Sequence, residues 1–148
     1  MSDIGFYHLT RTTLEDALPP LLGRTLEAGQ RAVIRCGDAA QVKALDEALW
    51  KAKSPLWLPQ GSQRMGFGPR QPIWLTRGDD VPNGARFLFL LDGGVEDGLE
   101  TFERIFTLFD GNDPEAVARA RARWSLVKKA GHNLAYWQQQ ERGWQKAG

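Results

Sequence analysis

The sequence is poor in the residues that build most metal and redox sites. Among 148 residues it has one cysteine, Cys36, and two histidines, His8 and His132. A lone cysteine cannot form an internal disulfide, and Cys36 follows an apolar run in which a packed, reduced thiol is the usual occupant. Neither histidine stands at metal-ligand spacing with it. We therefore expect no metal site, an unreactive thiol and a reducing compartment.

Long apolar runs are also missing. No segment approaches the ~18 consecutive apolar residues of a membrane span, and no basic region followed by an apolar stretch opens the chain. These absences, together with the reduced cysteine, predict a cytoplasmic protein.

Both glycine-rich phosphate motifs are absent. The sequence contains neither Gly-x-x-x-x-Gly-Lys-[Ser/Thr] nor Gly-x-Gly-x-x-Gly, which are the loops that hold nucleotide phosphates. The run 87–92 is typical of a strand that ends in a magnesium-binding acid, here Asp92, but that acid has no phosphate loop to work with. We expect a plain turn after the strand and no cofactor. A nucleotide-dependent enzyme that uses Asp92 and the loop 61–72 remains an alternative.

An excess of charge of either sign is missing too. The chain has 19 basic and 18 acidic residues and a net charge of +1, so it has no global field that would hold a phosphate backbone. Any role on DNA is therefore expected to be mainly indirect. Direct binding of single-stranded DNA, through arginine contacts and tryptophan stacking, remains a second alternative.

What is present is an alternation of strand-like and helix-like segments, from which we predict the following elements. Strands are expected at 5–9, 31–36, 73–76, 87–91 and, more weakly, 132–139; helices are expected after Thr12–Thr13, after Gly37–Asp38, over 99–109 and from Asp113 to Gly131. The pair Pro19–Pro20 leaves two starts open for the first helix, at the threonines or at the prolines. Prolines and glycines over 53–72 predict a long loop without regular structure. The pattern indicates an α/β fold, a single domain over 1–148 with a mainly parallel sheet and helices on both faces, nucleotide-binding-like but without a phosphate loop.

The last predicted helix carries a basic surface. Within eleven residues it has five cations and no acid: Arg119, Arg121, Arg123, Lys128 and Lys129. Arg121, Trp124 and Lys128 follow one another at spacings of three and four, so they share one stripe of the helix. This stripe suits an acidic peptide with an apolar end. The alternative is that Trp124 belongs to a core-facing set with Val117, Ala120 and Val127.

Two tryptophans, Trp50 and Trp57, bracket Pro55 at the start of the long loop. Large aromatic side chains on such a loop can anchor a partner protein. They can equally cover the core of the sheet, and the residues themselves leave both readings open.

Four stretches in the same order resemble the chi subunit family of bacterial DNA polymerase III. They are Gly5–Leu9, Leu45–Trp50, Trp57–Pro59 and Ala130–Leu134. With the turn at 82–84 and the run 87–92, the resemblance extends over nearly the whole chain. It implies a nucleotide-binding-like fold without nucleotide chemistry, in a non-catalytic accessory subunit of the clamp-loader assembly.

The resemblance also implies two partner surfaces. One binds the acidic, phenylalanine-ending C-terminal tail of single-stranded DNA-binding protein at Arg121 and Trp124, with Arg123 and Lys128 as supporting cations. The other, with Trp50 and Trp57, contacts the psi subunit, and a helicase can compete there. The chain departs from the family pattern at Ser125, where a basic residue is expected, and at Val127, where an aromatic residue is expected.

Overall fold

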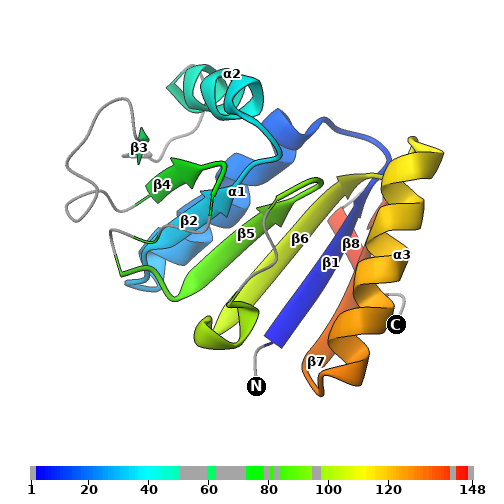
Figure 1. Cartoon of the computed structure of the whole chain (residues 1–148). Helices are drawn as coiled ribbons and strands as arrows, with labels where there is room; N and C mark the ends of the chain where they lie inside the picture. The colour runs from blue at the N-terminus through cyan, green and yellow to red at the C-terminus, as the bar shows by residue number, and fades with distance from the viewer. Residues whose placement is uncertain are drawn as a thin grey trace.

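The computed structural model describes residues 3–50, 60–62, 73–78, 81, 84–94, 98–140 and 143–146. In this part of the chain the strands form one sheet (Figure 1). The strands are β1 (Asp3–Leu9), β2 (Ala32–Arg35), β3 (Gln60–Ser62), β4 (Ile73–Thr76), β5 (Phe87–Leu91), β6 (Arg104–Asp110), β7 (Asn133–Gln140) and β8 (Gly143–Lys146). The helices are α1 (Leu14–Glu27), α2 (Ala39–Trp50), the short 3₁₀ helix η2 (Leu99–Thr101) and α3 (Pro114–Lys129). None of the described helices is long and apolar enough to cross a membrane.

The strand order is β3-β4-β2-β5-β6-β1-β7-β8. Every neighbouring pair is parallel except β7 and β8, which form an antiparallel edge. The first strand therefore lies between two strands from the C-terminal half of the chain. In its register, Tyr7 is opposite Leu108 on β6 and Trp137 on β7.

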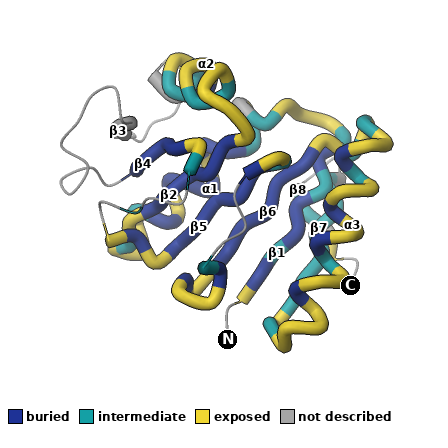
Figure 2. Tube along the Cα trace, viewed as in Figure 1, coloured by how far each residue is buried: buried dark blue, intermediate teal, exposed yellow. Residues whose placement is uncertain are grey.

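The helices lie on both faces of the sheet, as the alternation predicted. Side chains of α1 and α2 pack into one core cluster with Tyr7, Phe89 and Phe106. Side chains of α3 pack on the other face, in a cluster with Phe6 and Phe109. Figure 1 shows α3 in front of the sheet and α1 behind it, and Figure 2 shows β2 and β5 buried along their length. The predicted α/β class, the mainly parallel sheet and the central strand 87–91 are confirmed.

The helix predicted over 99–109 is wrong. Only the 3₁₀ helix Leu99–Thr101 forms there, and the residues from Arg104 to Asp110 form strand β6. Apolar residues in this segment fit helical spacing, but Ile105 to Phe109 are all buried because β6 lies between β5 and β1 with both faces covered. A strand covered on both faces has no polar side, so its apolar spacing does not distinguish it from a buried helix.

Two further details differ from or narrow the predictions. Residues 60–62 form the short edge strand β3, so the expectation of no regular structure over 53–72 is wrong at this point.

Helix α1 begins at Leu14 and includes both Pro19 and Pro20. Of the two possible starts the chain uses the threonines, and the N–H of Ala17 donates to the carbonyl of Thr13. Burial of Leu18 and Leu22 against the sheet stabilises a helix that lacks two of its internal hydrogen bonds.

Candidate functional site

Helix α3 begins and ends where the sequence predicted. The Asp113 carboxylate accepts a hydrogen bond from the N–H of Glu115 at 3.0 Å, which caps the first turn. The helix ends before Gly131, whose φ of 87° is in the left-handed region. The face toward the sheet consists of Ala116, Ala120, Arg123 and Val127, which are buried. Most of the other residues of α3 are exposed, and Val117 and Trp124 are half-buried.

Trp124 lies at the border between this buried face and the solvent. Its ring packs edge-on against Phe6 of β1, with ring centroids 5.1 Å apart, and against Tyr136 of β7 at 5.9 Å. The side chain is half-buried and belongs to the α3-side core cluster. Trp124 therefore packs with the core-facing set Val117, Ala120 and Val127, as one of the two interpretations predicted, and part of its side chain is also exposed to solvent.

Arg121 and Lys128 flank Trp124 on the helix, and both are exposed. Neither forms an ion pair with any residue that the structure describes. Burial raises the pKa of Tyr136, and the positive charge of Arg121 opposes this shift. The phenol oxygen lies 2.6 Å from Nδ1 of His8. The indole of Trp124 on α3 and the phenol of Tyr136 on β7 thus lie side by side, with ring centroids 5.9 Å apart.

Arg123 has a different environment from the one expected. Its exposed fraction is only 8%, so it faces the sheet and not the solvent. Arg119 is exposed, but it forms a two-pronged pair with Asp92, with Nε–Oδ1 and Nη2–Oδ2 distances of 2.7 and 2.6 Å. Hydrogen bonding to Asp92 raises the pKa of Arg119. Of the five cations of α3, Arg123 is therefore buried and Arg119 is neutralised by Asp92, which leaves Arg121, Lys128 and Lys129 as its basic surface.

The same pair explains the acid at the end of β5. Asp92 follows the central strand, where a nucleotide-binding protein would hold magnesium, and here it binds α3 to the sheet instead. Sequence reasoning missed this partner because the two residues are separated by 27 positions. The predicted plain turn is observed: the N–H of Gly94 donates to the carbonyl of Leu91, and Gly93 has a φ of 84°.

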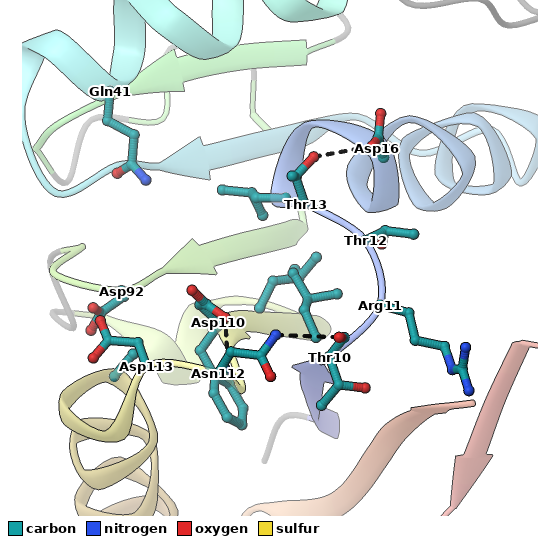
Figure 3. A pocket seen from close by; sticks show the side chains of 15 residues that line it. Thr10, Arg11, Thr12, Thr13, Asp16, Gln41, Asp92, Asp110, Asn112 and Asp113 are labelled. Atoms are coloured by element: carbon teal, nitrogen blue, oxygen red, sulfur yellow. Dashed lines mark hydrogen bonds between the residues drawn. The ribbon is translucent and has the colours of Figure 1, made fainter. Parts of the chain in front are cut away.

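A crevice of about 670 Å³ opens at the carboxyl ends of β1, β5 and β6 (Figure 3). Because α1 leaves β1 toward one face and α3 leaves β6 toward the other, this is the switch point at which open α/β sheets usually bind ligands. The crevice is lined by four carboxylates, and each already has a partner within the chain. These partners are the Thr13 hydroxyl for Asp16, Arg119 for Asp92, the Asn112 amide for Asp110 and the Glu115 amide for Asp113.

The backbone amides beside this crevice are also occupied. Three consecutive N–H groups, those of Thr10, Arg11 and Thr12, donate to Oε1 of Gln139 at 3.1, 2.8 and 3.1 Å. Such a run of amides is the kind of nest that holds a phosphate in nucleotide-binding proteins. Here a side chain from β7 fills it. Filled amides and neighbouring carboxylates argue against nucleotide phosphate in this crevice.

The remaining candidate catalytic group is Cys36. It is fully buried at the end of β2, and burial raises the pKa of its thiol to about 12. A thiol with this pKa is almost entirely protonated at neutral pH and is a poor nucleophile. No cluster of three or more histidine, cysteine, aspartate or glutamate side chains suited to a metal occurs among the described residues.

The side chains of the two tryptophans of the predicted partner-subunit surface lie outside the part of the chain that the structure describes. Trp50 is the last residue of α2, but its side chain lies outside the described residues, and so does the whole of Trp57. A feature that the sequence did not single out is Leu126 on α3. Its side chain is 62% exposed, on the flank of the helix away from Trp124.

Comparison with known proteins gives two agreeing results. Residues 1–135 match the family model described as DNA polymerase III chi subunit, HolC. The chain is also 24% identical, over 117 residues, to the probable DNA polymerase III subunit chi of Rickettsia prowazekii (strain Madrid E), and the alignment covers 74% of this chain and 71% of that protein. The family match includes the core of the sheet and all of α3, and the chain belongs to the DNA polymerase III chi subunit family.

Proposed function

We propose that this chain is a cytoplasmic, non-catalytic adaptor that binds the acidic C-terminal tail of single-stranded DNA-binding protein at α3. The observation that carries the proposal is the stripe Arg121–Trp124–Lys128. Its two cations are exposed and form no ion pair with a described residue, and its indole is held in place by Phe6. Cations of this kind can pair with tail carboxylates, and the ring edge can cover a terminal apolar side chain.

The details of the stripe refine which residues contact the tail. Arg123 is buried, so we assign it to support of the helix and leave direct contact with the tail to Arg121 and Lys128. Arg119 is paired with Asp92, which reduces its attraction for a second acid. With two available cations, binding should weaken as salt rises. An affinity in the micromolar range, about 8 kcal/mol, is the expected scale.

The test uses a fluorescent peptide with the sequence of the acidic tail. The protein is titrated with this peptide, and binding is measured by fluorescence anisotropy. The double variant Arg121→Ala/Lys128→Ala should bind at least about tenfold more weakly, since two charge-assisted contacts are lost. A matched control, Arg24→Ala/Arg104→Ala, removes the same charge from exposed residues on the opposite side of the sheet and should bind as the wild type does. Absence of binding by the wild type, or an equal loss in both variants, would contradict the proposal.

We further propose that the chain joins the clamp loader through the psi subunit, at the surface that carries Trp50 and Trp57, where a helicase can compete. Support comes from the family to which the chain belongs. Co-purification with a psi subunit should be lost in Trp57→Ala and kept in Arg121→Ala/Lys128→Ala. Loss in the second variant alone would place the subunit at α3 and contradict the assignment.

The alternative of a nucleotide-dependent enzyme has one supporting feature, the crevice at the strand ends. Its amides and carboxylates are already bonded within the chain. A nucleotide that bound the folded state would raise the melting temperature. We expect no shift with millimolar nucleotide and magnesium, and a clear shift would restore this alternative.

A further inference from the structure

A cluster of aromatic rings lies on the face of the sheet opposite α3, at the β7–β8 end. Tyr7 of β1 stacks on Trp137 of β7, with ring centroids 6.4 Å apart and planes 15° apart. Trp144 of β8 meets the Tyr7 ring edge-on at 5.1 Å. Both tryptophans are only half-buried. Helix α1 packs mainly over β2 and β6 on this face, and the middle of β7 has an intermediate burial throughout (Figure 2). This aromatic surface is therefore partly open to solvent.

Two arginines border the rings. The guanidinium of Arg104 lies over the ring of Phe106, 4.9 Å from its centroid, and the side chain is exposed. Arg24 is exposed in the last turn of α1. Both arginines line the same hollow as Tyr7. Burial raises the pKa of Tyr7, and the charges of Arg104 and Arg24 oppose this shift. Neither arginine has an ion pair with a described residue.

A third cation and the shape of the surface complete the arrangement. Lys146 of β8 is exposed and is the register partner of Trp137. Two hollows of about 180 Å³ each are both lined by Tyr7 and Arg104. One has Gly5 in its wall, where a Cβ would come within 2.8 Å of the Tyr7 ring. Glycine at this position lets the ring lie flat along the strand.

One acid borders the first hollow. Asp3 is the register partner of Arg104, and its carboxylate accepts a hydrogen bond from the side-chain amide of Asn133 at 2.9 Å. Among the described residues that line the two hollows, Asp3 is the one acid, and Arg24 and Arg104 are the cations. We call the surface formed by these two arginines, Lys146 and the half-buried rings of Trp137 and Trp144 the open face. Tyr7, on which Trp137 stacks, is itself buried.

We propose that the open face binds single-stranded nucleic acid. Each nucleotide of a single strand offers a flat base and a phosphate, which are the complements of a stacked aromatic ring and of a neighbouring unpaired cation. A duplex hides the flat faces of its bases, so the same surface should discriminate against it. The open face and the tail-binding stripe of α3 lie on opposite faces of the sheet. The proposal therefore goes beyond the proposed function and stands without it.

The test is anisotropy of a fluorescein-labelled thymidine oligonucleotide, titrated with the full chain in low salt and without any single-stranded DNA-binding protein. Each phosphate contact on a single strand contributes about −0.7 to the slope of the logarithm of the association constant against the logarithm of the salt concentration. Three contacts therefore predict a slope of roughly −2. Arg24→Ala/Arg104→Ala should weaken binding about tenfold or more and make the slope shallower. These residues are exposed, so the variant should fold, and circular dichroism checks that it does.

The matched control is Arg121→Ala/Lys128→Ala, which removes the same charge from α3 and should keep full affinity for the oligonucleotide. The two double variants thus separate the two proposals, since each should lose one ligand and keep the other. Equal loss in both variants would show binding by net charge alone and overturn the open face as the site. No binding by the wild type, or equal affinity for a duplex, would overturn the proposal. Displacement of the oligonucleotide from the wild type by the acidic tail peptide would also overturn it, because the two ligands are assigned to opposite faces of the sheet.

Discussion

The bond between Gln139 and the loop after β1 makes a quantitative prediction. Oε1 of Gln139 accepts three backbone N–H groups, and Nε2 donates to the Thr12 hydroxyl at 2.8 Å. Gln139→Ala removes all four bonds. A net hydrogen bond contributes about 0.5–1.5 kcal/mol, and this loop is partly exposed, so water replaces part of the loss. We expect the free energy of unfolding to fall by about 2 kcal/mol, which for a chain of this length lowers Tm by roughly 4–8 °C.

Urea denaturation followed by circular dichroism measures this loss. Gln138→Ala is the matched control, because Gln138 is the same residue type on the same strand, faces the other side of the sheet and has no side-chain hydrogen bond with a described residue. It should change stability by less than about 0.5 kcal/mol. Gln139→Glu keeps an acceptor for the three amides and should retain most of the stability. If the two alanine variants were equally stable, or if glutamate were as damaging as alanine, the amide nest would not depend on this acceptor.

Two more predictions concern the core and the strand ends. Gly111→Ala should destabilise the fold by about 1–3 kcal/mol in thermal unfolding, because the new Cβ would overlap the imidazole of His8 and crowd the carbonyl of Leu9; an unchanged Tm would contradict this packing. The Cys36 thiol should resist a thiol reagent at pH 8 in the native state and react in urea. Since its folded pKa is raised from 9.0 to about 12, the folded state keeps a proton that the unfolded state releases above about pH 9, so this residue should lower stability as pH rises from about 9 toward 12. Cys36→Ser should flatten that part of the stability curve, and an unaltered curve would contradict the assignment.

Much of the fold could be predicted from local pattern alone. The central strand 87–91 and the capped helix from Asp113 are confirmed, because an apolar run between turns and an Asp-Pro start are strong local signals. The local pattern predicts a helix where β6 forms, because the burial of this strand on both faces depends on β5 and β1, which no local window contains. The same limit applies to β8, for which the local pattern predicts no element.

The candidate site shows a similar division. The spacing of Arg121, Trp124 and Lys128 predicted a shared stripe, and the structure places the two cations beside a half-buried indole. The burial of Arg123 could not be predicted, because a helix spacing gives relative directions and does not say which direction faces the sheet. The pair between Arg119 and Asp92 was missed because it joins two elements through the fold.

The position of β1 has a consequence for how the protein is made. This strand leaves the ribosome well before both of its neighbours, β6 and β7, which come from residues 104–140. Its apolar side chains, among them Phe6 and Tyr7, therefore have no sheet to join until most of the chain has been synthesised. Contacts of such large sequence separation slow folding and leave strand edges open to wrong pairing. β1 should thus gain its native partners only after β6 and β7 have been synthesised, and a chaperone or a rapid collapse can protect it until then.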